Sequence, residues 1–151
     1  MTSGILRLAV VLFAASASLT GAARAYDFGP IAPMDTKDLD PAMLNDVYGK
    51  WEIRDKSGKK RCVITLLKEP AIGGNQLDIA PGCDKAFPVM ADIGAWRLLE
   101  SWGIDLVDPL RKIRVRFTTP DERYVAFGDK KDIAGMDDFL KVEEKPAPKK
   151  K

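Results

Sequence analysis

An alternation of apolar and polar side chains, with a period of two, is the feature that most restricts the fold of this sequence. It is clearest in residues 112–118, where three apolar side chains alternate with three basic ones. Successive side chains of a strand point to opposite faces, so we expect the apolar set to face a core and the basic set to face water. The apolar residues are Ile113, Val115 and Phe117, and the basic residues are Lys112, Arg114 and Arg116.

The same pattern recurs along most of the chain, with turn signals roughly every 8 to 12 residues, which is typical of a β-sandwich or an up-and-down barrel. We favour an all-β, eight-stranded antiparallel up-and-down barrel, similar to a lipocalin, because closure removes the exposed edges of an open sheet. Such a barrel is either filled by its own side chains or holds one small ligand. The predicted strands are residues 50–55, 61–68, 75–80, 94–99, 104–107, 112–118, 123–127 and 138–142.

Two segments precede the predicted barrel. Residues 26–39 contain Gly29, Pro30 and Pro33 but no apolar periodicity, so we expect an extended, mobile arm. Asp40 followed by Pro41 then predicts an N-cap and the first position of a short helix that ends before Gly49.

The first 25 residues have the pattern of a cleavable export signal. Arg7 precedes a short apolar run, and Ala23-Arg24-Ala25 fits a cleavage site, so the mature protein is expected to begin at Tyr26. The alternative is a buried N-terminal helix of the mature fold. The run is too short to span a bilayer, and neither residue at the cleavage point is the cysteine of a lipid anchor. We therefore expect a periplasmic or secreted protein.

Charge divides the remaining chain into a mildly acidic body and a basic end. Without Arg7 and Arg24, 22 basic side chains face 22 acidic ones, and four of these bases are lysines in the last seven residues. Residues 144–151 are expected to be a disordered, solvated tail that could weakly contact an anionic membrane surface. No basic stripe of the kind that binds nucleic acid is present. The predicted organisation is thus a signal at 1–25, an arm at 26–39, a barrel domain at 40–143 and the tail.

Cys62 and Cys83 are the two cysteines of the chain. In an exported protein we expect them to form a disulfide. For a ring of this length, the chain-entropy model predicts that the bond stabilises the folded protein by roughly 3 kcal/mol. The alternative is a reactive thiol, but neither cysteine has a C-x-x-C spacing or a histidine to activate it.

Catalysis is disfavoured by what the sequence lacks. It has no histidine, so Ser-His triads, Cys-His dyads and histidine metal sites are excluded. After residue 25 the serines are Ser57 and Ser101, neither in a nucleophile motif, and no phosphate-binding loop or dinucleotide fingerprint occurs. We expect a protein that is not an enzyme and that carries no cofactor or metal.

Trp51 and Trp96 lie in the first and fourth predicted strands. The simpler expectation is that they fill the two ends of the barrel as large core residues. The alternative is that they line a ligand pocket.

The order of these features is informative as a whole: an export signal, an arm, a short helix, and then a barrel pattern with two cysteines. Over about residues 41–142 this order resembles the Inh/AprI family of bacterial metalloprotease inhibitors, whose barrel domain also occurs in an outer-membrane lipoprotein. Gly49-Lys50-Trp51 alone is also similar to the first-strand motif of lipocalins, which share the barrel. The marker residues are Gly49, Trp51, Cys62, Cys83, Trp96, Arg123 and Tyr124.

This resemblance implies a monomeric periplasmic inhibitor whose partner is a secreted bacterial zinc metalloprotease of the serralysin type. The barrel with its disulfide would be a rigid platform, while the first residues of the arm would enter the active-site cleft near the catalytic zinc. The arm is longer here than in the better-known members. Its leading residues would be Tyr26, Asp27, Phe28, Gly29 and Pro30.

Two other functions remain open on the sequence. A lipocalin-like carrier of a small apolar ligand would need a cavity in the barrel, whereas an inhibitor platform would have a filled interior. A structural envelope protein would use its basic tail at the membrane surface.

Overall fold

A computed structural model describes residues 25–143 of the 151-residue chain. Apart from Ala25, the predicted export signal lies outside the described residues, and so does the predicted tail at 144–151. Between residues 25 and 143, no helix is long and apolar enough to cross a membrane.

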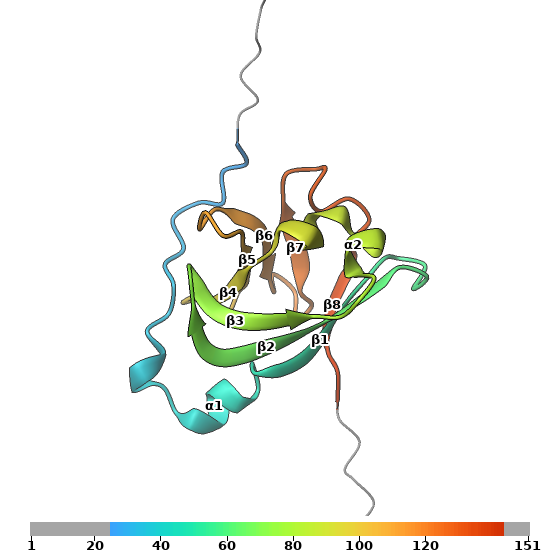
Figure 1. Cartoon of the computed structure of the whole chain (residues 1–151). Coiled ribbons are helices and arrows are strands. Elements are labelled where there is room, and N and C mark those ends of the chain that lie inside the picture. The colour runs from blue at the N-terminus through green and yellow to red at the C-terminus, as the bar shows by residue number, and fades with distance from the viewer. Residues whose placement is uncertain (1–24, 144–151) are drawn as a thin grey trace, which may run out of the picture.

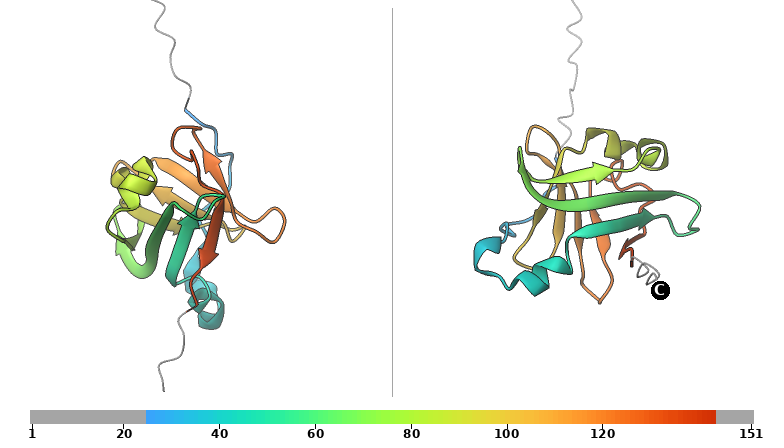
Figure 2. Two further views of the ribbon diagram at one scale, coloured as in Figure 1. Left: turned by 90° about the vertical axis from the view of Figure 1, so that its right-hand side faces the viewer. Right: turned by 60° about the horizontal axis from the view of Figure 1, so that its bottom comes forward.

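Eight antiparallel strands form one sheet that curls into a nearly closed barrel (Figures 1 and 2). From β1 to β7 each strand pairs with the next one in sequence, and β8 pairs with β1, so the sheet order is β7-β6-β5-β4-β3-β2-β1-β8. The barrel predicted from the alternation is therefore confirmed. The strands are β1 (Gly49–Arg54), β2 (Arg61–Ala71), β3 (Gly74–Ile79), β4 (Ala95–Leu98), β5 (Ile104–Val107), β6 (Ile113–Thr118), β7 (Val125–Gly128) and β8 (Asp138–Lys141).

The two ends of the sheet, β7 and β8, come together with little backbone pairing. A single bridge joins Tyr124 to Phe139, and the Arg123 guanidinium lies 3.2 Å from a carboxylate oxygen of Asp138. These contacts occupy the edges that an open sheet would expose, as the preference for a closed barrel requires.

Four short helical segments accompany the barrel. One lies at the end of the arm, and the next follows it with Asp40 as its cap, which accepts a hydrogen bond from the Ala42 N–H, as predicted. The segment inside the arm and the two between β3 and β4 were not predicted, because runs of three to five residues show no helical period. The segments are η1 (Thr36–Asp38), α1 (Pro41–Asn45), α2 (Cys83–Ala86) and η2 (Pro88–Asp92).

Aromatic side chains fill the barrel interior. The ring of Phe139 stacks between Phe117 and Trp51, with centroid distances of 4.1 Å and 4.7 Å, and Tyr124 meets Trp51 edge-on. Trp96 is also buried and donates its indole N–H to the Leu67 carbonyl. Trp51 and Trp96 are therefore core residues, which was the simpler of the two expectations.

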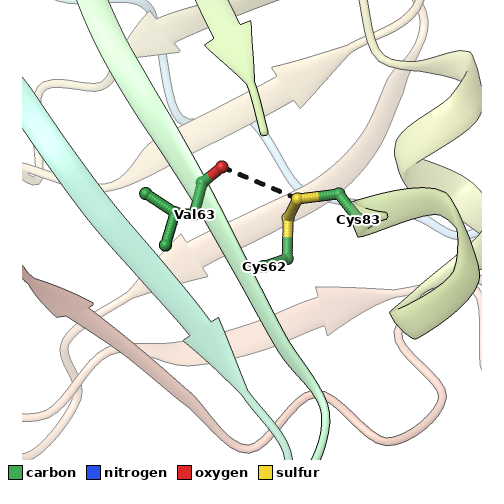
Figure 3. The surroundings of a disulfide bond; sticks show 3 residues. All are labelled: Cys62, Val63 and Cys83. Atoms are coloured by element: carbon green, nitrogen blue, oxygen red, sulfur yellow. Dashed lines mark hydrogen bonds between the residues drawn. A yellow bond between two sulfur atoms is a disulfide. The ribbon is translucent and has the colours of Figure 1, made fainter. Parts of the chain in front are cut away.

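The predicted disulfide is present and joins β2 to α2 (Figure 3). Cys62 and Cys83 are both buried, and Cys83 is the first residue of α2. The Cys83 sulfur lies 3.6 Å from the Val63 carbonyl oxygen, but an oxidised sulfur has no proton to donate, so this is a packing contact. The Val63 carbonyl accepts its hydrogen bond from the Ala80 N–H instead. The disulfide thus attaches the segment between β3 and β4 to the barrel wall.

Candidate functional site

The arm, residues 26–39, runs along the outside of the barrel (Figure 1). In that view it descends along the left side of the molecule, from the start of the described chain to η1 and α1 at the bottom. Except for η1 it has no helix, so its course is largely extended, while its mobility stays a prediction. Its contacts with the barrel were not predicted, and they fall into two groups.

The first group of contacts is a short β-pairing between the arm and the end of β4. The Met34 N–H donates to the Leu98 carbonyl over 2.8 Å, and the Glu100 N–H donates to the Ala32 carbonyl over 3.0 Å. Between these bonds Pro33 forms a bridge with Leu99. We call Ala32, Pro33 and Met34 the anchor of the arm.

The register of the sheet explains why β4 has a free edge at this point. Asn75 of β3 is opposite Trp96 of β4, and β3 begins one residue earlier, at Gly74. The chain has already turned away at Gly73, so β4 residues beyond Arg97 have no partner in β3. Unpaired backbone groups at a buried edge are costly, and the anchor supplies the missing hydrogen bonds.

The second group of contacts centres on Arg116 of β6. The expectation that this side chain faces water is wrong, because the residue is only 3% exposed. Its guanidinium binds both carboxylate oxygens of Asp105 on β5, with N···O distances of 2.6 Å and 2.9 Å. The remaining nitrogen donates to the Phe28 carbonyl, and the guanidinium carbon lies 5.4 Å from the centroid of the Phe28 ring.

Arg116 does point away from the core, as the alternation requires, but the outer wall is covered at this position. Asp105 is directly opposite Arg116 in the β5–β6 register, and Phe28 lies over the pair. Arg114 also lies mostly out of solvent, since it binds Asp132 through two nitrogens and Asp92 through a third. The hydrogen bond to Asp132 is the main cause that raises the pKa of Arg114 above its ordinary value.

The five predicted arm residues differ in how they meet the barrel. Phe28 is half-buried against Arg116, whereas Tyr26 is 39% exposed and touches the Phe28 ring edge-on. Asp27 accepts a hydrogen bond from the Gly29 N–H over 2.9 Å, and Gly29 has a φ of +69°, which favours glycine. Pro30 is exposed. Among these five residues, Phe28 is the one that the barrel holds by a hydrogen bond.

Gly49 and Trp51, which mark the resemblance, have structural roles at the start of β1. Gly49 has a φ of +107°, a conformation that other residues rarely adopt. Three residues separate it from the end of α1, and it turns the chain into the strand. The Trp51 indole N–H then donates to the Val47 carbonyl over 2.7 Å, which ties the turn after α1 to the barrel.

Hollows on this part of the molecule are shallow and open to solvent. One of about 180 Å³ lies between the arm and the β6–β7 wall and is lined by Phe28, Ile31 and Phe127 among others. Another, of about 290 Å³, lies beside α1 and is lined by Met43, Trp102 and Tyr124 among others. Within residues 25–143, no group of three or more Asp, Glu, Cys or His side chains is arranged to hold a metal ion.

Comparison with known families identifies the family of the chain. The family model for "Protease inhibitor Inh" matches residues 42–132, more than half of the chain. The chain belongs to the Inh family of protease inhibitors. No curated protein and no solved structure is significantly similar to it. Membership supports a role as a protease inhibitor in this Inh-family chain and is consistent with a protein that is not an enzyme.

The matched region has clear limits within the structure. It begins inside α1, ends in the loop after β7, and contains both cysteines and both buried tryptophans. The arm lies before it. The family match therefore covers β1 to β7 of this Inh protein, whereas β8 and the arm lie outside it, and the role of the arm depends on its own geometry.

The Asp105–Arg116 pair was missed in the sequence, although a signal was present. Asp105 is the one charged residue in the apolar strand 104–107, and the hairpin after that strand brings it opposite Arg116. A lone carboxylate in such a strand requires a partner when it is buried. No pattern in the arm itself indicated that Phe28 would complete the site.

Proposed function

We propose that this chain inhibits a secreted zinc endopeptidase of the serralysin type by inserting the first residues of its arm, Tyr26 to Pro30, into the active-site cleft. Membership of a protease inhibitor family supports inhibition in general. The observation that carries the finer proposal is the state of residues 26–30, which lie outside the barrel, have no regular secondary structure, and are hydrogen-bonded to it only through Phe28. An extended segment of this kind can occupy a protease cleft without unfolding the barrel.

The chemistry of the arm suits a zinc site. Once the export signal is removed, Tyr26 has a free α-amine, whose ordinary pKa near ~8 allows it to lose a proton and become a metal ligand. The Asp27 carboxylate is a weaker candidate because one of its oxygens already accepts the Gly29 N–H. We therefore assign the ligand role to the amine or to the adjoining backbone carbonyl.

The barrel is suited to act as the platform. Its interior is occupied by stacked aromatic rings, and the disulfide attaches α2 to its wall. A filled interior favours a platform over a carrier of an apolar ligand. Since the free amine requires removal of residues 1–25, we further propose that the mature protein acts in the periplasm or outside the cell. We also propose that it acts as a monomer.

The test compares three proteins that all begin after the signal: the chain from Tyr26, the same chain without residues 26–31, and a chain with one added glycine before Tyr26. We expect the deletion to abolish inhibition of a serralysin-type protease. The added glycine should weaken inhibition at least tenfold, because it displaces the amine from the zinc by one residue. The measurement is the inhibition constant, with a trypsin-like serine protease as the specificity control.

Thermal unfolding of all three proteins controls for the integrity of the barrel. A shortened protein that inhibits as strongly as the full chain would refute arm insertion and direct attention to the barrel loops. Strong inhibition of the serine protease alone would refute the choice of target while leaving the family role intact.

A further inference from the structure

We propose that Arg116 is a positioning residue for the arm: it holds residues 26–31 against the barrel wall in the free protein, and this contact must break before they can enter a protease. The inference rests on the proposed insertion of the arm for its functional consequence. Its structural part, the attachment of the arm to Arg116, can be tested without any protease target.

The geometry at Arg116 divides one guanidinium between two partners. Asp105 binds two of its nitrogens and so fixes the plane of the group. The third nitrogen is thereby aimed at the Phe28 carbonyl, and the Phe28 ring lies over the same guanidinium. Asp105 thus orients the guanidinium, and Phe28 occupies the donor and the face that Asp105 leaves free.

The arm is consequently attached at two separate points. The anchor, Ala32 to Met34, continues the sheet beside β4 and places Met34 against the core. Ahead of it, Phe28 makes the one hydrogen bond that joins described residues 26–31 to the barrel. The intervening chain contains Gly29 in a left-handed conformation, followed by Pro30. Breaking the Phe28 contact therefore frees a segment of six residues, about 20 Å long when extended, while the anchor keeps its bonds.

Release of Phe28 leaves no buried charge without a partner, because Arg116 keeps both bonds to Asp105. The step therefore costs less free energy than breaking the ion pair would. While the contact persists, the carbonyl and ring of Phe28 are not available to a protease cleft. The apparent affinity is then reduced by the fraction of molecules in which the arm is attached.

The first measurement is cleavage of the free protein by chymotrypsin after Phe28, a bond that the attachment protects. We expect Arg116→Gln to be cleaved there about tenfold faster than the unaltered protein. Arg114→Gln is the matched control, since it removes an ion-paired arginine two residues away on the same strand that does not touch the arm. Because Arg116→Gln leaves Asp105 buried without a partner, the double variant Asp105→Asn/Arg116→Gln is measured beside it, and thermal unfolding verifies that each variant is folded.

The second measurement is the rate constant of association with the serralysin-type protease. It should rise about tenfold in both Arg116 variants and remain unchanged in Arg114→Gln, with no change in the dissociation rate constant. Equal cleavage after Phe28 in the Arg114 and Arg116 variants overturns the attachment whatever the inhibition data show.

The two measurements together separate this inference from the proposed function. Faster cleavage without any inhibition in any protein supports the attachment and refutes arm insertion. Faster cleavage with slower association shows that the attached arm is the form that binds, which overturns the requirement for release.

Discussion

The interior of the barrel and the arm on its outer wall are held by different kinds of contact. The interior combines stacked rings, almost complete burial and a covalent bond between β2 and α2. The arm has two backbone hydrogen bonds at its anchor and one side chain, Arg116, at its tip. The first set stabilises the fold, whereas the second can be broken locally. This difference is what a rigid platform with a displaceable inhibitory segment requires.

Substitution in the aromatic stack should have the largest effect. Phe139 contacts three other rings and is fully buried, so Phe139→Ala is expected to lower the free energy of unfolding by about 4 kcal/mol. Urea unfolding measures this, with Leu140→Ala as the control, because Leu140 is adjacent in β8 but 38% exposed. Equal losses in the two variants would mean that the ring stack does not stabilise the barrel more than its surface does.

Removal of the disulfide should come next. The double variant Cys62→Ala/Cys83→Ala is expected to lose roughly 3 kcal/mol of unfolding free energy, because the unfolded chain is no longer restricted by the ring. Urea unfolding with and without a reducing agent gives the measurement. Reductant should destabilise the natural sequence and leave the double variant unchanged; destabilisation of both would point to an effect unrelated to this bond.

Most of the barrel could be predicted from the sequence because its signals are local. Each predicted strand boundary differs from the observed one by three residues or fewer, and the limits of Ile104–Val107 agree at both ends. Alternation and turn residues are properties of neighbouring positions, so they are visible without the fold. The pairing of Cys62 with Cys83 was predictable because only two cysteines were available.

The contacts of the arm could not be predicted in this way. Arg116 and Phe28 are 88 positions apart, and neither has a neighbour that indicates the other. The free edge of β4 arises from the register of β3, in which Asn75 is opposite Trp96, and no local pattern specifies that register. The alternation predicted the direction of Arg116 correctly, but it carries no information on what covers an outward side chain.

Deletions of different length should separate the two attachments of the arm. Loss of residues 26–31 removes the tip alone, and we expect it to lower the free energy of unfolding by about 1 kcal/mol. Loss of residues 26–35 also removes both anchor bonds to β4, at about 1 kcal/mol each, so it should destabilise the protein by about 2 kcal/mol more. Urea unfolding of the two shortened proteins tests this, and equal stabilities would show that the anchor adds nothing to the fold.

Tyr124 lies at the closure between β7 and β8, at the edge of the interior, and its substitution should give the smallest effect. Burial raises the pKa of its hydroxyl above the ordinary value of 10.0, and the hydroxyl donates to the Trp102 carbonyl over 2.9 Å. Above about pH 10 the unfolded chain releases this proton while the folded protein retains it, so the free energy of unfolding falls as the pH rises. At neutral pH, Tyr124→Phe should lower the free energy of unfolding by about 1 kcal/mol, because it removes the hydrogen bond.

The pH dependence of that variant distinguishes a buried contact from an exposed one. Urea unfolding at pH 8 and at pH 10.5 should show that the difference in free energy of unfolding between Tyr124→Phe and the natural sequence is smaller at the higher pH. The reason is that the variant has no proton to lose at this position. A gap of constant size would place the Tyr124 hydroxyl in contact with water in both states. The closure between β7 and β8, where Tyr124 is bridged to Phe139, would then resemble the displaceable arm more than the fixed interior.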